Sequence, residues 1–283
     1  MHRLSHDEHS SLCVFAAKIS TSPIRLPLTH TRNLVPDTWN QPMTLPDNWD
    51  SPQNILVVLA HPDDPEFFCG GTLAKWARSG HHITYQLLTC GDKGFNTSTP
   101  ADMTPDTLCA IRHEEQQAAA KVIGVKEVHF MDCPDGYLVP DIDLRRDIVR
   151  IIRKFKPDIL VTCDPQTLFA IYGINHPDHR AAGQATMDAV FPAAGSPVFF
   201  PELLIEGHLP HMPREVWCSL TLQPNVVVDI TDTWHVKLDA ILQHKTQIGD
   251  VDPFIERMKS RRTEDSTDEN PRFEEKFRVV KYG

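Results

Sequence analysis

Short, largely apolar runs alternate with helical patterns from residue 54 onward, and this alternation constrains the fold more than any other feature. A strand that is apolar at nearly every position has to be buried on both faces, which requires helices on both sides of a parallel sheet. We therefore predict an α/β fold with a doubly wound, mostly parallel sheet, whose last two strands pair near the sheet edge. The predicted strands are 54–60, 83–89, 127–131, 158–163, 216–222 and 226–230, and the predicted helices are 71–79, 107–123, 144–155, 177–190, 234–247 and 253–262.

The chain divides into three parts by composition. Residues 1–50 are rich in Pro, Thr, Ser and His with weak periodicity, so we expect an N-terminal extension there. Residues 51–262 carry the alternating pattern and form the expected main domain. Residues 263–283 form a charged C-terminal segment, of which 263–276 are expected to be exposed.

The charge of the chain argues against nucleic acids and membranes as partners. Its 28 basic and 38 acidic residues give a formal net charge of −10, whereas nucleic-acid-binding proteins usually carry a basic surface. No stretch reaches the roughly 18 consecutive apolar residues that span a bilayer. Asp7 and Glu8 precede the apolar piece at 12–17, which does not resemble a signal peptide.

The cysteines favour a reducing compartment. There are seven of them without a CxxC pair, and Cys69, Cys90 and Cys163 lie in or beside apolar runs. Reduced, mostly structural thiols are the expected state of such residues. The predicted location is therefore cytoplasmic.

An unusual polar stretch, HPDDPE at 61–66, follows the first predicted strand directly. Ligands of doubly wound sheets bind beyond the carboxyl ends of the strands, which is where His61, Asp63 and Asp64 are expected. One Asp there is commonly a helix cap, and a lone His is commonly a surface residue. Two adjacent carboxylates repel each other unless a positive charge lies nearby, and a divalent metal would supply it. His61 and one carboxylate are suitable first ligands for zinc.

A second polar stretch, NHPDHR at 175–180, lies beyond the predicted strand at 158–163. Pro177 fits the first turn of a helix, so His176 and His179, three apart, project to similar sides. One could bind a metal while the other faces a substrate. An isolated HxxH pattern is at least as often a pair of ordinary histidines, but two such motifs at neighbouring strand ends favour a metal site.

Both motifs together resemble the LmbE-like, or PIG-L, family of zinc-dependent N-acetylglucosaminyl deacetylases. The resemblance extends from about residue 54 to residue 250 and implies a Rossmann-like, three-layer α/β sandwich. It rests on AHPDD at 60–64, GGT at 70–72 and HPDH at 176–179, with weaker support from RHEEQQAAAKVIG at 112–124.

The resemblance implies a role for each motif residue and makes 51–262 the catalytic domain. His61, Asp64 and His179 are implied as the zinc ligands. Asp63 is implied as the general base toward the zinc-activated water, and His176 as the group that stabilises the oxyanion or protonates the leaving amine. Zinc lowers the pKa of bound water toward about 7 and polarises a carbonyl, although a His₂Asp site also accepts Fe²⁺, Co²⁺ or other divalent ions.

The sequence leaves the roles of four further residues open. Arg112 either pairs with Glu115 on its own helix or, as the family implies, binds a substrate hydroxyl or phosphate. Asp92 either forms a turn, which is favoured, or binds a sugar hydroxyl. Asp178 could orient a histidine from behind. His244 matches a histidine on a late helix of the family, and a packed structural histidine is the default.

The predicted function is hydrolytic removal of an acyl group, expected to be acetyl, from an N-acylated amino sugar or a related small amide. An amidase of a larger thiol or antibiotic conjugate is the alternative within the family. A nucleotide-binding Rossmann module is disfavoured, because carboxylates replace the GxGxxG turn and would repel a pyrophosphate. A non-catalytic assembly protein would not need a base beside an open zinc position. The family implies a homo-oligomer, a trimer or hexamer.

Overall fold

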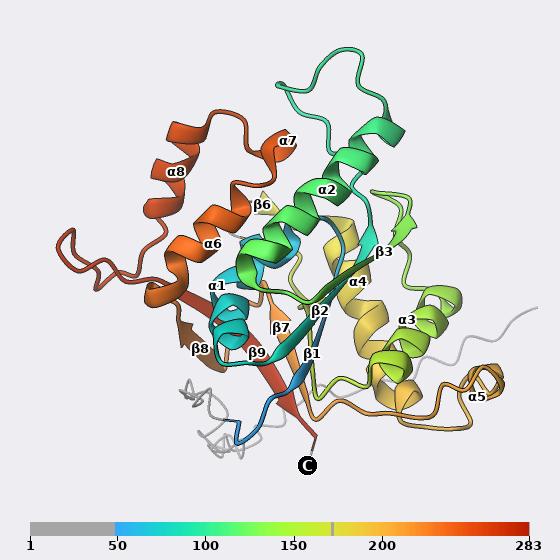
Figure 1. Cartoon of the computed structure of the whole chain (residues 1–283). Helices are drawn as coiled ribbons and strands as arrows, with labels where there is room; N and C mark the ends of the chain where they lie inside the picture. Colours follow the sequence, from blue (N-terminus) through green and yellow to red (C-terminus); the bar gives the residue numbers. More distant parts are fainter. Residues whose placement is uncertain (1–48, 171–172, 283) are drawn as a thin grey trace, which may run out of the picture. The chain divides into compact units, whose positions relative to one another are not determined.

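The computed structural model of the chain describes residues 49–170 and 173–282 (Figure 1). All but the last two residues of the predicted N-terminal extension, 1–50, lie outside this part of the chain. Within it, one seven-stranded sheet has the order β3-β2-β1-β4-β7-β9-β8, and β5 and β6 form a separate small sheet. The strands are β1 (Asn54–Leu59), β2 (His82–Thr89), β3 (Glu127–Cys133), β4 (Ile159–Cys163), β5 (Phe169–Ala170), β6 (Gly173–Ile174), β7 (Glu215–Ser219), β8 (Val226–Asp229) and β9 (Glu274–Lys281).

Helices cover both faces of the sheet, as Figure 1 shows. Along β1, Ile55 and Val57 join the core on one face while Leu56 and Val58 join the core on the other, as the apolar run requires. The pairings β1–β2, β2–β3, β1–β4 and β4–β7 are parallel, so the predicted α/β fold with a doubly wound, mostly parallel sheet is confirmed. One face carries α1 (Asp64–Arg78), α2 (Pro105–Ile123) and α6 (Trp234–Ile241), and the other carries α3 (Ile142–Phe155) and α4 (Pro177–Asp188).

The strand order creates a switch point between β1 and β4. The chain builds β1, β2 and β3 outward in one direction and then returns to place β4 on the other side of β1. In open α/β sheets the crevice at such a point, beyond the carboxyl ends of the strands, is where ligands bind. The segments that leave β1 and β4 carry the two polar motifs at 61–66 and 175–180.

The sheet edge differs from the prediction. We expected the strands at 216–222 and 226–230 to pair with each other, but β9 lies between β7 and β8 and runs antiparallel to both. The strand sequence EEKFRVVK has buried positions between exposed or half-exposed ones and contains five charged residues. We therefore did not distinguish it from the rest of the charged segment 263–283. Glu275 is buried and accepts hydrogen bonds from the backbone N–H groups of Gly71 (3.0 Å) and Thr72 (2.8 Å), which ties β9 to α1.

Helix α1 begins at Asp64, seven residues earlier than predicted, because Pro65 fits its first turn. The motif residues 61–64 therefore lead straight into the helix, and Gly71 lies in its interior. A Cβ on Gly71 would lie 2.6 Å from Ile230 Cδ1, so only glycine allows this close approach. The predicted helix 234–247 is divided into α6 and α7 (Lys245–Ile248).

Two cysteines that the sequence does not pair form a disulfide, Cys90–Cys109. Cys69 and Cys163 are free and fully buried, as expected of structural thiols. The prediction of a reduced thiol is therefore wrong for Cys90 in this structure. Its partner lies 19 positions away on α2, a contact that spacing alone does not reveal.

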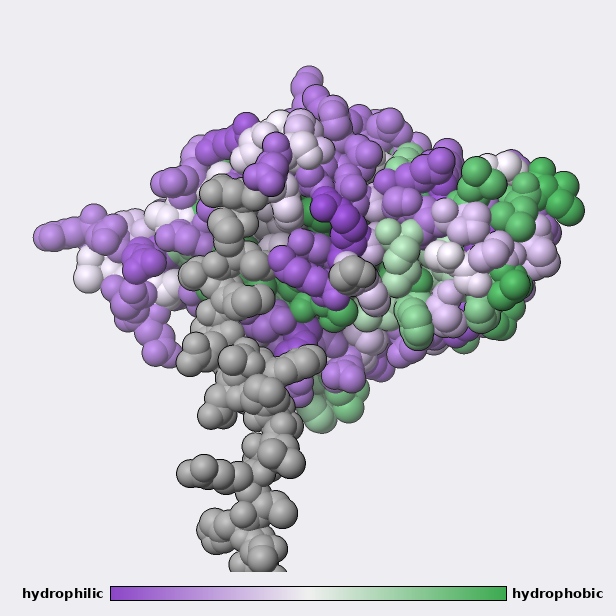
Figure 2. Space-filling view, turned by 90° about the horizontal axis from the view of Figure 1, so that it is seen from below, coloured by the Kyte–Doolittle hydropathy of each residue, from purple (hydrophilic) through white to green (hydrophobic). Residues whose placement is uncertain are grey.

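The surface around α5 (Glu202–Ile205) is apolar. Figure 2 shows hydrophobic residues gathered on this side of the molecule, and Ile205 is 91% exposed there, with Val198 and Leu209 exposed nearby. None of the described helices has the length and apolar character needed to cross a membrane.

Candidate active site

A cavity of ≈ 1490 Å³ lies at the carboxyl ends of β1 and β4 and brings both motifs together. Its lining includes His61, Asp63 and Asp64 from the segment after β1, and His176 and His179 from the start of α4. These residues are more than a hundred positions apart in the sequence, and the parallel pairing of β1 with β4 puts them at one edge of the sheet.

Three of these side chains converge on one point. Nδ1 of His61 lies 3.2 Å from Nε2 of His179 and 3.4 Å from Oδ2 of Asp64. The same Nε2 of His179 lies 3.0 Å from Oδ1 of Asp64. All three residues are buried, and their ligand atoms lie within 4.8 Å of one another, so the group could hold a metal ion.

The far side of the His61 ring faces two carboxylates. Its Nε2 lies 3.1 Å from Asp135 Oδ1 and 3.3 Å from Asp178 Oδ2. In a neutral ring this nitrogen carries the proton and donates it to these acceptors, which leaves the lone pair on Nδ1. A carboxylate behind a ligating histidine fixes its tautomer and raises its basicity.

Hydrogen bonding also sets the orientation of the His179 ring and the position of its proton. Its Nδ1 lies 2.9 Å from Oδ1 of Asn175, whose amide Nδ2 donates to the Thr167 carbonyl and so directs the oxygen toward the ring. Nδ1 is therefore the protonated nitrogen, and the lone pair is on Nε2. When both rings are neutral, the nitrogen lone pairs of His61 and His179 face each other at 3.2 Å, an arrangement that a shared cation stabilises.

The electrostatics of the cluster also favour a cation. Burial by itself lowers the pKa of His61, but Asp64, Asp135 and Asp178 outweigh it and hold that pKa well above its usual value. Burial raises the pKa of Asp64, yet the attraction of His179 and His61 lowers it far below its usual range. Burial also opposes ionisation of Asp135, but its hydrogen bond to His61 lowers its pKa to about 2. Three ionised carboxylates around one imidazole suit a divalent ion.

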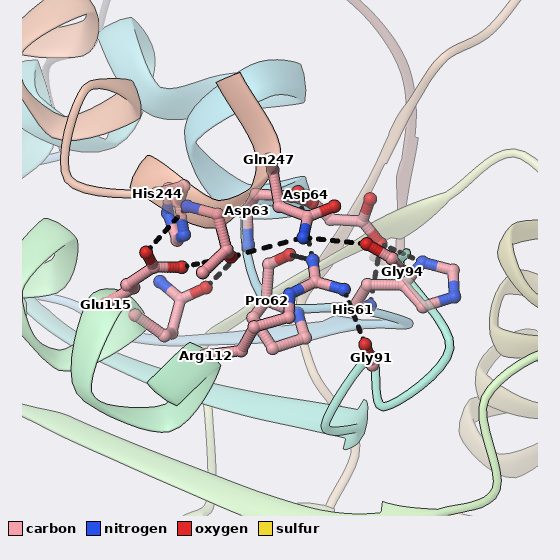
Figure 3. Close-up of polar contacts among 12 residues, drawn as sticks. His61, Pro62, Asp63, Asp64, Gly91, Gly94, Arg112, Glu115, His244 and Gln247 are labelled. Carbon is pink, nitrogen blue, oxygen red and sulfur yellow. Dashed lines mark hydrogen bonds and ion pairs between the residues drawn. The ribbon is translucent and has the colours of Figure 1, made fainter. Parts of the chain in front are cut away.

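Asp63 occupies the N-cap position of α1 but does not cap the helix with its side chain. Its backbone has a φ of 92°, in a region that costs a non-glycine residue on the order of 1–3 kcal/mol. This conformation turns the carboxylate toward Arg112, whose Nη2 donates to Oδ2 at 3.0 Å (Figure 3). Burial raises the pKa of Asp63, and Arg112 offsets part of that rise. The alternative of an ordinary helix-capping Asp is therefore wrong for Asp63.

Arg112 links three parts of the site. Besides Asp63 it donates to the carbonyl oxygens of Pro62 (2.5 Å) and Gly91 (3.0 Å), and it lines the cavity. Glu115 accepts hydrogen bonds from the backbone N–H and hydroxyl of Thr246 instead. Arg112 and Glu115 therefore have other partners, and the alternative of an Arg112–Glu115 ion pair on the helix is wrong.

His176 lies at the start of α4 and lines the cavity. Its Nδ1 accepts a hydrogen bond from the backbone N–H of Asp178 (3.2 Å), so the neutral ring carries its proton on Nε2. Burial and the nearby His61 lower the pKa of His176, which favours the neutral form.

Two predicted site residues lie outside the cavity lining. Asp92 lies in a turn that the hydrogen bond from the Gly94 N–H to the Gly91 carbonyl closes, as the favoured alternative predicts. Its Oδ1 accepts from the backbone N–H of Asp135 (3.2 Å), and its Oδ2 pairs with Lys93 (3.2 Å). Asp178 is fully buried behind His61 and also accepts from the backbone N–H groups of Gly136 and Leu138.

Three residues that the sequence does not single out take part in the site. Asp135 follows β3 in an Asp-Gly turn, so its place at a strand end was a usable signal. Gln116 accepts from the Asp63 N–H (2.8 Å) and donates to both oxygens of Glu66, which itself pairs with His244 at 3.1 Å. Both His244 and Glu66 are 0% exposed. His244 is therefore packed, as the default predicts, and belongs to the polar network behind Asp63.

Asp178→Asn is expected to weaken metal affinity about 10–100-fold, because it removes a carboxylate charge behind His61. Metal titration against a chromophoric chelator measures this. Asp188→Asn is the matched control, since Asp188 lies on the same helix and pairs with Arg145 away from the cavity. Equal affinities in the two variants would show that Asp178 does not support His61.

The sequence is similar to a protein family and to several characterised proteins. Residues 56–190, which contain both motifs, match the family model described as PIG-L: GlcNAc-PI de-N-acetylase. Diacetylchitobiose deacetylase of Thermococcus kodakarensis is 37% identical over 195 residues, which cover 69% of this chain and 70% of that protein. A probable N-acetyl-alpha-D-glucosaminyl L-malate deacetylase 2 of Bacillus cereus is 30% identical over 199 residues, 69% of this chain and 84% of that protein.

The solved structure of N,N'-diacetylchitobiose deacetylase from Pyrococcus horikoshii is similar as well. It superposes with a TM-score of 0.73 at 28% sequence identity. The match covers 82% of this chain and 85% of that chain.

Proposed function

The chain belongs to the PIG-L family, and from this membership we propose that it is a zinc-dependent N-deacetylase of an N-acetylated amino sugar. The observation that carries the proposal is the convergence of His61, Asp64 and His179 beside Asp63 in one cavity. The catalytic domain is proposed to comprise residues 51–262 together with β9, because β9 completes the sheet.

The residues fit a divalent metal. Two imidazole lone pairs and one carboxylate are the donors of many catalytic zinc sites, which keep a further position open. His61, Asp64 and His179 would hold the ion, and other divalent ions suit the same donors. A bound zinc ion supplies Lewis acidity, which acidifies water and polarises the acyl carbonyl.

Asp63 is proposed as the general base that takes the proton of the attacking water. Its carboxylate lies next to a proposed ligand and accepts a hydrogen bond from Arg112, and the Gln116 side chain accepts from the backbone N–H of Asp63. Its raised pKa brings it closer to neutral pH than an ordinary Asp, which strengthens it as a base.

His176 is proposed to stabilise the oxyanion or to protonate the leaving amine, and the contacts of its ring support the first role. The contact from the Asp178 N–H holds its Nδ1 as an acceptor, so the Nε2–H is the donor available to a substrate. Its lowered pKa supports a neutral ring that donates a hydrogen bond.

The substrate is proposed to be larger than one acetylated sugar. The cavity, at ≈ 1490 Å³, exceeds the roughly 300–1,000 Å³ of ordinary small-molecule pockets. Tyr137, 71% exposed, and Lys93 line its outer part. A disaccharide such as N,N'-diacetylchitobiose suits this space, and contact of Arg112 with the substrate stays a prediction.

The test is acetate and free-amine release from N-acetylglucosamine and N,N'-diacetylchitobiose by zinc-loaded protein. We expect acetate from the disaccharide at the higher kcat/KM. Release of a longer acid from a conjugate, with no acetate from either sugar, would favour the amidase alternative. Tight dinucleotide binding without hydrolysis of any amide would contradict the hydrolase.

His176→Ala is expected to lower kcat by on the order of 10²–10³, because it removes one donor to the oxyanion. KM and metal content are expected to stay near the wild-type values, as measured by steady-state kinetics and elemental analysis. His129→Ala, at a surface histidine paired with Glu127, is the control. An unchanged kcat would exclude His176 from the chemistry.

Assembly as a homo-oligomer, a trimer or hexamer, is also proposed. The exposed apolar residues Val198, Ile205 and Leu209 support it, because such patches commonly mark protein contacts. Light scattering of the purified protein tests this, and a monomer would contradict it. The cytoplasmic location stays a prediction: buried free thiols favour it, whereas the Cys90–Cys109 disulfide is more typical of an oxidising compartment.

A further inference from the structure

A second cluster of metal-ligating side chains lies outside the proposed zinc site, where β2, α2 and β3 meet. It comprises Cys90, Cys109, His113 and Asp132, whose ligand atoms all lie within 4.8 Å of one another. Nε2 of His113 lies 3.9 Å from Sγ of Cys109 and 2.9 Å from Oδ1 of Asp132. The two sulfurs are joined in a disulfide.

Local structure directs each side chain to this point. Cys90 directly follows β2, and Cys109 and His113 are four apart on α2, so they lie on the same side of the helix. The His113 ring stacks on Phe130 of β3 with a centroid distance of 3.8 Å, which fixes its plane.

Asp132 reaches the cluster through an irregularity in β3. The pairing passes from Leu87 with Phe130 to Thr89 with Cys133, so β3 has one additional residue between these pairs. Asp132 lies in this bulge with a φ of 53°. Bulges redirect side chains and are frequent next to functional sites. A disulfide needs neither an imidazole nor a carboxylate beside it, so the pairing of the cysteines does not explain why both converge there.

We propose that Cys90, Cys109, His113 and Asp132 form a second metal site, for Zn²⁺ or a similar thiophilic ion, when the two cysteines are reduced. Two thiolates, one imidazole and one carboxylate make a closed set of four donors, which is typical of a structural rather than a catalytic zinc site. Tetrahedral zinc with bonds of about 2.0–2.3 Å places its donors about 3.3–3.8 Å apart. The separations from His113 are already close to this range, so mainly the sulfurs have to move apart.

The two states of the cluster exclude each other, because the same sulfurs form either the disulfide or the thiolate ligands. A water-soluble phosphine reduces the disulfide: phosphorus is oxidised to the phosphine oxide with oxygen from water, and each sulfur gains a proton. Binding of the divalent ion then releases the two thiol protons. The cluster lies next to the contact between Arg112 and the Gly91 carbonyl, because Gly91 follows Cys90 and Arg112 precedes His113.

Titration with Co²⁺ tests the site on the whole chain without reference to deacetylase activity. The proposed His61, Asp64 and His179 site contains no sulfur, so thiolate-to-cobalt charge-transfer absorption reports the second site alone. Phosphine-reduced wild-type protein is expected to bind two equivalents of Co²⁺ with this absorption. The oxidised protein is expected to bind one equivalent without it. A reduced protein with one equivalent and no such absorption would overturn the proposal.

Variants identify the ligands. Cys109→Ser is expected to abolish the thiolate absorption in the reduced protein, and His113→Gln to weaken the second equivalent at least about tenfold. Cys133→Ser is the matched control, because Cys133 is a free cysteine next to Asp132 and should leave the absorption intact. Loss of the absorption in Cys133→Ser with retention in Cys109→Ser would move the site away from the proposed residues. Circular dichroism verifies that each variant is folded.

Discussion

In the protein with the Cys90–Cys109 disulfide intact, His179→Ala is expected to abolish stoichiometric metal binding and to lower kcat/KM by on the order of 10³–10⁴. The substitution removes one of the two nitrogen lone pairs that face each other at 3.2 Å, and leaves His61 and Asp64 as a two-donor remnant. Lewis acidity at a reacting carbonyl contributes several kcal/mol, and about 1.36 kcal/mol corresponds to a factor of ten in rate.

Elemental analysis and acetate release from N,N'-diacetylchitobiose measure the two effects together. His208→Ala is the control, because it also removes one histidine, at a half-buried position near Glu206. This variant should retain metal and activity. A His179→Ala protein that keeps a full equivalent of metal at this site would exclude His179 as a ligand. Metal lost with activity retained would contradict the metal-dependent mechanism itself.

The layered fold was predictable because a strand that is buried on both faces needs apolar residues at consecutive positions, and such a run is visible in the sequence. Every position of β4 is buried, and the run that encodes it is apolar enough to be recognised alone. Strand β9 escaped prediction because five of its eight residues are charged, and its place in the sheet depends on β7 and β8 rather than on its own sequence. A strand whose charged and apolar residues alternate in this way is distinguished from an exposed tail only by its partners.

The centre of the site was predictable for a different reason. His61 and His179 lie in short, unusual motifs at strand ends, and parallel strands bring their carboxyl ends to one edge. Asp178, which lies behind His61, was also suggested by its place in the second motif, but the polar network behind Asp63 was not predictable. Glu66 and His244 are 178 positions apart, and each is an ordinary helix or loop residue by composition. The Arg112–Asp63 contact likewise depends on how α2 packs over α1, which no local pattern encodes.

Asp63→Asn is expected to lower kcat by about 10²–10⁴, the range that general acid–base catalysis contributes. Asparagine has the same shape, and its amide oxygen can still accept from Arg112, so the loop and helix start should be preserved. The proton acceptor is lost while the proposed ligand Asp64 is untouched, so metal content and KM are expected to stay near the wild-type values. Single-turnover acetate release with metal-loaded protein measures the chemical step directly.

Arg112→Lys tests whether Arg112 acts by orienting the Asp63 carboxylate. Lysine keeps a positive charge but cannot contact Asp63, Pro62 and Gly91 together, because it lacks the planar fork of arginine. If Asp63 is the base and Arg112 orients it, Arg112→Lys lowers kcat in the wild-type background but has little further effect when combined with Asp63→Asn. Fully additive losses in the double variant would mean that Arg112 acts elsewhere, on the substrate. An Asp63→Asn protein that keeps its metal and the wild-type kcat would show that the proton is accepted by another group.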